Sequence, residues 1–77
     1  MNTMPKMKYT VYNTELRRYL KRATQPLGCA SEVVTEWTRR VEMAQGFPGK
    51  KSAEAMVRRL GGYSELVVKN SRGEIIA

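Results

Sequence analysis

The sequence predicts a small α+β domain with the element order β-α-α-α-β-β, in which three helices pack on a short antiparallel sheet. Two observations predict this class. Apolar residues recur at helical spacing in three segments, each bounded by glycine, proline or a capping residue. β-favouring residues gather instead near the N-terminus and in the last thirteen residues, where a turn separates two short runs. A chain of 77 residues with 42% hydrophobic and 27% charged residues suits one folded domain.

The first half of the chain is expected to hold a strand and two helices. Residues 1–6 are interpreted as a flexible leader, and residues 7–77 as a single domain with its first strand at 7–12. Asn13 or Thr14 is expected to cap a helix over 14–24. On that helix an arc of about 100° holds the apolar side chains of Leu16, Tyr19, Leu20 and Ala23. The opposite side holds the basic side chains of Arg17, Arg18, Lys21 and Arg22.

Two further helices and a hairpin complete the expected fold. Ser31 is the expected cap of a helix over 31–45, on which Glu36 and Arg40 are spaced for an ion pair. Ser52 is the expected cap of a helix over 52–60, with Arg58 and Arg59 opposite its apolar side. The hairpin comprises strands at 65–69 and 74–77, joined by a four-residue turn. We expect it to pair with the first strand, so that Val11, Leu66, Val68 and Ile75 or Ile76 are buried against the helices.

The composition argues against catalysis. The chain contains no histidine and no aspartate, so its seven acidic residues are all glutamates, scattered along the sequence. General acid-base catalysis at neutral pH most often uses His, Asp or Glu, and a zinc site needs several His or Cys ligands. Cys29 is the sole cysteine, which indicates a reducing compartment and no disulfide within the chain. We therefore expect no enzyme, no metal site and no cofactor.

The basic residues point to an anionic partner. Ten of the fourteen form adjacent pairs, namely Arg17-Arg18, Lys21-Arg22, Arg39-Arg40, Lys50-Lys51 and Arg58-Arg59. A net charge of +7 attracts nucleic acid or an acidic protein or nucleoprotein surface. No apolar run approaches the roughly 20 residues that span a bilayer. We expect a cytoplasmic protein without a membrane partner, and the small core leaves a homodimer open.

A glycine-containing loop precedes the third expected helix. Gly46-Phe-Pro-Gly49, followed by Lys50 and Lys51, resembles the Gly-x-x-Gly loop with which KH domains clamp a nucleic-acid backbone, over about residues 33–77. A plain helix-breaking turn with solvated lysines is the alternative. The element order over 7–43 is also similar to ribbon-helix-helix repressors, and 52–60 with the hairpin resembles a recognition helix with a wing. None of the three resemblances identifies a family.

These observations together predict a non-catalytic nucleic-acid-binding protein, with DNA slightly favoured over RNA. The residues expected to contact phosphates are Arg17, Arg18, Lys21, Arg22, Lys50, Lys51, Arg58 and Arg59, with Gly46 and Gly49 in the loop. Trp37 is expected in the core, while Tyr12 and Tyr63 are candidates for stacking on bases. The alternative is a small phage-type inhibitor or adaptor, similar in size to anti-CRISPR proteins, that docks through its basic face on a larger complex.

Overall fold

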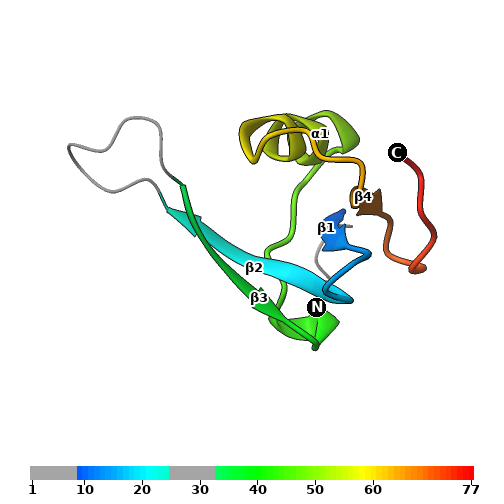
Figure 1. The fold of residues 1–77 in the computed structure, drawn as a ribbon. Helices are drawn as coiled ribbons and strands as arrows, with labels where there is room; N and C mark the ends of the chain where they lie inside the picture. The colour runs from blue at the N-terminus through cyan, green and yellow to red at the C-terminus, as the bar shows by residue number, and fades with distance from the viewer. Residues whose placement is uncertain (1–8, 25–32) are drawn as a thin grey trace.

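The computed structural model describes residues 9–24 and 33–77 and shows one antiparallel sheet covered by one helix. The strands are β1 (Thr10–Asn13), β2 (Arg18–Thr24), β3 (Val34–Thr38) and β4 (Leu66–Lys69), in the order β3-β2-β1-β4. A 3₁₀ turn, η1 (Val41–Met43), and the helix α1 (Lys50–Arg59) lie between β3 and β4. Figure 1 shows α1 above one side of the sheet and the β2–β3 hairpin extending beyond the β1–β4 pair.

The predicted fold class is therefore wrong: the described chain has one α-helix and four antiparallel strands, not three helices on a short sheet. The expected leader at 1–6, Cys29 and the expected cap Ser31 lie outside the described residues. The third helix is confirmed by α1, although the helix begins at Lys50 rather than at Ser52. The predicted pairing of the first strand with the strand at 65–69 is confirmed, because Val11 lies opposite Val68 in the β1–β4 pair. The expected strand at 74–77 is wrong, because that segment forms only an isolated bridge between Lys69 and Ile75.

A tight turn and a strand stand where the first helix was expected. The Asn13 side-chain oxygen accepts the backbone N–H groups of Glu15 and Leu16, both at 2.9 Å, and closes the turn between β1 and β2. Arg17 completes the turn with a φ of 58°. A helix here would stack Arg17 on Lys21 and Arg18 on Arg22, which are like-charge neighbours that oppose helix formation. Strand pairing removes that repulsion.

The second expected helix is replaced by β3 and η1. Val34, Thr35, Trp37 and Thr38 are β-branched or aromatic, so they lose rotamer freedom in a helix and pack well in a sheet. The register pairs Leu20 with Trp37 and Arg22 with Glu36, and Lys21 between them forms a bulge in β2. Side chains alternate across a strand, so Trp37 faces the helix-covered side and Glu36 faces the other.

The core lies between the sheet and α1. Its buried members come from β1, β2, α1, β4 and the segment before the helix: Val11, Leu20, Phe47, Ala53 and Val68. Phe47 exchanges two backbone hydrogen bonds with Tyr9, at 2.8 and 2.9 Å, beyond the point where β2 diverges from β1. The C-terminal residues return along β4, where the Ile76 N–H donates to the Val68 carbonyl at 2.8 Å. The sheet thus gains backbone partners beyond its four strands.

Candidate functional site

The eight predicted phosphate-binding cations lie in four places in the fold. Arg17 is in the β1–β2 turn, and the others are on β2 (Arg18, Lys21, Arg22), in the first turn of α1 (Lys50, Lys51) and in its last turn (Arg58, Arg59). The predicted basic stripe on a first helix does not exist, because that segment is a turn and a strand. Arg18 pairs with Asn13 on the helix-covered side, whereas Arg22 pairs with Glu36 on the other side.

The exposed side of α1 carries the most regular group of cations. Ala53 is buried, and Met56, Val57 and Leu60 pack against the core on the same side of the helix. At 100° per residue, Lys51 and Arg58 then fall together on the opposite side, about 10 Å apart along the axis. Both are exposed. Lys50 lies on a flank, where its ammonium group is 3.8 Å from the Glu54 carboxylate.

The Gly46–Gly49 loop differs from the predicted clamp. No α-helix precedes it among the described residues, since 33–45 contain β3 and the 3₁₀ turn η1. Phe47, in the middle of the loop, is only 6% exposed and its backbone bonds to Tyr9, so the loop is anchored to β1. Gly49 is the N-cap residue of α1, and its carbonyl accepts the Ser52 hydroxyl at 2.9 Å. The loop therefore supports the core and begins the helix.

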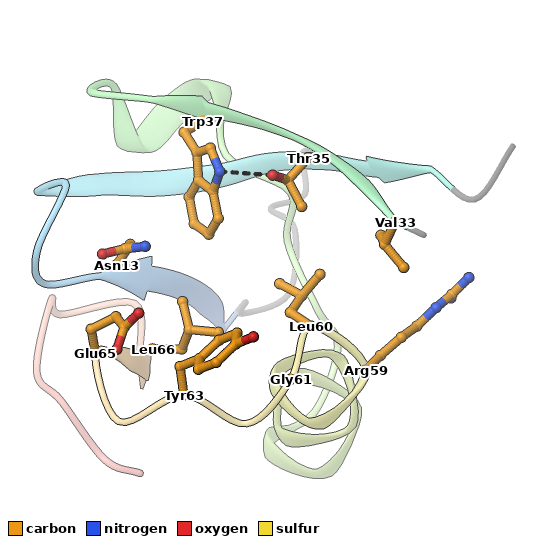
Figure 2. Close-up of a pocket in the computed structure, with 10 residues that line it drawn as sticks. All are labelled: Asn13, Val33, Thr35, Trp37, Arg59, Leu60, Gly61, Tyr63, Glu65 and Leu66. Atoms are coloured by element: carbon orange, nitrogen blue, oxygen red, sulfur yellow. Dashed lines mark hydrogen bonds between the residues drawn. The ribbon is translucent and has the colours of Figure 1, made fainter. Parts of the chain in front are cut away.

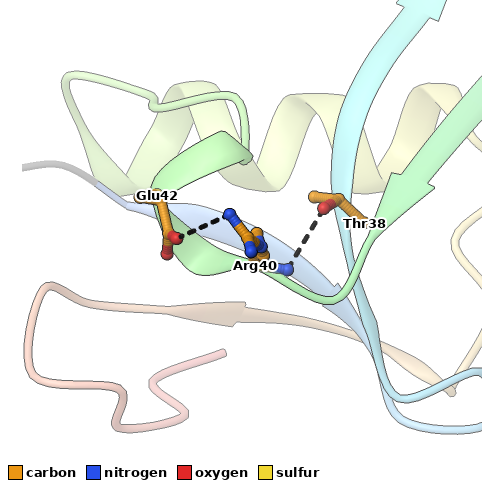
Figure 3. A network of polar contacts seen from close by, with 3 residues as sticks. All are labelled: Thr38, Arg40 and Glu42. Carbon is orange, nitrogen blue, oxygen red and sulfur yellow. Dashed lines mark hydrogen bonds and ion pairs between the residues drawn. The ribbon is translucent and has the colours of Figure 1, made fainter.

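Arg40 belongs to a local surface network. Its backbone N–H donates to the Thr38 hydroxyl at 3.1 Å, and its guanidinium lies 3.8 Å from the Glu42 carboxylate (Figure 3). The expected pair between Glu36 and Arg40 is wrong, because it required helical spacing and Glu36 lies in β3. An ion pair this exposed contributes at most about 1 kcal/mol.

The face of the sheet away from α1 holds an aromatic pair with a cation. The Tyr12 and Tyr19 rings are cross-strand neighbours, with centroids 4.8 Å apart in an edge-to-face arrangement. The Lys69 ammonium group lies 3.8 Å from the Tyr12 ring centroid and 5.4 Å from that of Tyr19. Cation–π attraction fixes the lysine over the rings. Tyr12, a candidate for stacking, thus already has an aromatic and a cationic neighbour.

A cleft of about 450 Å³ opens between β3, the end of α1 and the segment that leads to β4. Its aromatic walls are Trp37, which is half-buried, and Tyr63, which is 59% exposed. Figure 2 shows the Trp37 ring extending from β3 into this space and the Tyr63 ring on the opposite side, near Leu60. The Trp37 indole N–H donates to the Thr35 hydroxyl at 2.9 Å, which fixes the orientation of the ring.

The two ends of the cleft have different charges. Arg59 lies at the end near Val33, while Asn13 and Glu65 lie at the other end (Figure 2). The Asn13 oxygen accepts two backbone N–H groups of the turn, so its amide nitrogen faces the cleft. The cleft therefore presents a hydrogen-bond donor and a carboxylate beside aromatic walls, with a guanidinium at the opposite rim.

Sequence reasoning missed most of this site. Trp37 packs against the core as expected, but it is only half-buried, and its remaining surface forms a wall of the cleft. The sequence predicts a helix cap at Asn13 and no functional role for Glu65, although both residues line the cleft. Two residues of the cleft carry a sequence signal: Tyr63 is a stacking candidate because it flanks a predicted strand near basic residues, and Arg59 is a predicted phosphate contact.

No protein family model matches the chain, and no curated protein or solved structure matches it either. Within residues 9–24 and 33–77, no three Cys, His, Asp or Glu side chains cluster closely enough to hold a metal ion. Among the same residues, no helix has both the length and the apolar character needed to cross a membrane. The geometry of the site therefore carries the functional argument.

Proposed function

We propose that this protein is a non-catalytic nucleic-acid-binding protein that contacts phosphates through the cations of β2, its preceding turn and α1. One observation carries the proposal: with a net charge of +7, the chain keeps Arg17, Arg22, Lys51 and Arg58 exposed. Arg40 forms an ion pair with Glu42, and Lys50 forms one with Glu54. These two pairs do not account for the excess of positive charge. An excess of exposed positive charge favours binding to the phosphates of a nucleic acid.

The test is a titration of fluorescently labelled 20-mers, as duplex DNA, single-stranded DNA and RNA, between 50 and 300 mM salt. If about six cations neutralise phosphates, the logarithm of affinity falls with the logarithm of salt at a slope near −5 for duplex and about −4 for single strands. DNA is expected to bind slightly more tightly than RNA. Absence of salt-dependent binding to all three nucleic acids would refute the proposal.

A matched pair of variants separates location from overall charge. The double substitution Lys51→Glu and Arg58→Glu changes the net charge from +7 to +3, and so does Arg39→Glu with Arg40→Glu. All four side chains are exposed, so both variants are expected to fold. The first variant is expected to lose at least tenfold more affinity than the second. Equal losses would show that net charge alone, and not the α1 surface, governs binding.

The alternative function, docking of an inhibitor or adaptor on an acidic protein surface, uses the same cations. Affinity capture with and without nuclease separates the two. A partner protein that stays bound after nuclease treatment, together with no shift of any labelled nucleic acid, would favour the docking protein. Loss of captured material on nuclease treatment would favour the nucleic-acid-binding protein.

A further inference from the structure

We infer that the cleft between β3 and the end of α1 binds one unpaired nucleobase, and that guanine is the base that it prefers. This inference rests on the proposed function and assigns a second, base-reading contact to it. Phosphate contacts position a nucleic acid, while contacts with base edges carry the sequence information.

The walls suit a flat aromatic ligand. The hydrogen bond to Thr35, at 2.9 Å, already orients the Trp37 ring. A base that stacks on the ring therefore costs little side-chain conformational entropy. Leu60 and Leu66 supply apolar surface beside the two aromatic rings. The volume, about 450 Å³, lies within the range typical of small-ligand pockets. Stacking of bases on aromatic side chains is the common way in which proteins hold single strands.

Tyr63 is exposed and yet held in place. Its ring lies directly against the backbone of Gly61, where an added Cβ would come within 2.5 Å of the Tyr63 Cε2 atom. Gly61 also has a φ of +114°, which side chains rarely adopt. A large aromatic ring that is 59% exposed, and is seated on a glycine at the mouth of a cleft, is available to a ligand.

The polar end of the cleft reads a base edge. A carboxylate repels phosphate but accepts adjacent N–H groups, and the neighbouring Asn13 amide nitrogen donates. The edge of guanine presents one carbonyl acceptor followed by two N–H donors, which is the complement of this donor and carboxylate. Thymine and uracil carry a single ring N–H, so they leave part of the Glu65 carboxylate unsatisfied.

The opposite end of the cleft suits the sugar-phosphate backbone of the nucleic acid. Arg59 lies at the rim near Val33, across the cleft from Glu65 (Figure 2). A nucleotide whose base edge reaches Asn13 and Glu65 directs its sugar and phosphate toward that cation. A base in a duplex has its pairing edge occupied and both of its faces stacked, so the cleft requires an unpaired base.

Trp37 is the single tryptophan of the chain, so its fluorescence reports on the cleft alone. The experiment titrates the protein with a single-stranded five-mer of thymidines and with the same five-mer carrying a central guanine, at 50 mM salt. We expect quenching by the guanine five-mer at an affinity roughly tenfold higher than for the thymidine five-mer. A hairpin duplex with the guanine paired is expected to cause no quenching. RNA five-mers with uridine in place of thymidine show whether the base comes from DNA or RNA.

Two variants test the residues. Tyr63→Ala is expected to weaken binding of the guanine five-mer roughly tenfold, whereas Tyr63→Phe retains the ring and the affinity. Glu65→Gln is expected to lower the affinity for the guanine five-mer roughly tenfold, to about that of the thymidine five-mer, because a neutral amide cannot accept both N–H groups of the guanine edge. Circular dichroism checks that each variant folds, which the exposure of Tyr63 favours.

The outcomes separate the two proposals. Salt-dependent binding of 20-mers without Trp37 quenching, or with no effect of Tyr63→Ala, would overturn the base pocket and leave nucleic-acid binding standing. Equal quenching by paired and unpaired guanine would overturn it as well. No binding of any 20-mer or five-mer would refute the proposed function itself.

Discussion

Replacing Leu20 and Leu16 separately by alanine tests the strand β2 directly. A helix over 14–24 places both leucines on one buried stripe, four residues apart. In the structure Leu20 is fully buried at 0% exposure, while Leu16 lies in the β1–β2 turn at 46% exposure. The two substitutions remove the same atoms, so the difference between them reports only on burial.

The expected losses follow from that burial. Replacing a fully buried leucine by alanine lowers the free energy of unfolding by about 2–5 kcal/mol, because apolar burial is lost and a cavity remains. Leu20 lies opposite Trp37 across the β2–β3 pair and belongs to the core with Val11 and Val68, so a loss of about 3 kcal/mol is expected. Leu16 is expected to lose at most about 1 kcal/mol, in proportion to its smaller buried area.

Urea denaturation followed by circular dichroism measures both values. A domain of 77 residues has a total stability of about 4–12 kcal/mol, so Leu20→Ala removes a large share of it. With a slope of about 1 kcal/mol per M, the unfolding midpoint falls by about 3 M for Leu20→Ala and by less than about 1 M for Leu16→Ala. Similar shifts for the two variants would refute the strand and support the helix.

Three further predictions concern single sites. Gly61→Ala forces the Tyr63 ring away from the backbone and places alanine at a φ of +114°, so a stability loss of about 1–2 kcal/mol and weaker quenching of Trp37 by guanine are expected in the urea and fluorescence assays. Thr10→Val removes a hydroxyl that is buried without a hydrogen-bond partner in the described part of the chain, so thermal denaturation is expected to show a stability gain of about 1 kcal/mol. Lys69→Met and Tyr12→Leu, combined in a double-mutant cycle, are expected to reveal a coupling of about 0.5–1 kcal/mol from the cation–π contact, which a coupling of zero would exclude.

Elements with one dominant local signal could be predicted from the sequence. The helix α1 has a glycine before it, two glycines after it, and an apolar side built on Ala53, Met56 and Val57. The strands β1 and β4 are rich in valine and other β-favouring residues, and Val11 and Val68 are buried as expected. In these segments local propensity and tertiary packing agree.

The segments that became β2 and β3 carry two periodicities at once. Leu16, Tyr19 and Leu20 recur at helical spacing, but Tyr19 and Leu20 also alternate between the two faces of a strand. Contacts remote in sequence decide between them, since Tyr19 packs on Tyr12 and Leu20 reaches the core. The like-charge neighbours on the expected helix were the one local sign against it, and their cost of a few tenths of a kcal/mol is too small to decide.

The candidate site is harder to predict from the sequence than the fold. Its aromatic walls and polar end come from β1, β3 and the segment after α1, which are separated by more than twenty residues from one to the next. No local motif marks such a cleft. The basic residues can be found from the sequence alone. Their predicted arrangement, however, rested on helices that the structure does not contain.

The positions of the cations favour a flexible partner over a rigid one. Arg17 lies in the β1–β2 turn, and Arg22 lies on the face of the sheet away from α1, whereas Lys51 and Arg58 are about 10 Å apart on the helix that covers the other face. A rigid duplex requires cations on one continuous surface. A single strand can bend from one group to the next and place an unpaired base in the cleft between them, at the cost of ordering its backbone. The difference in affinity between single strands and duplex therefore tests the arrangement of the cations independently of the base pocket.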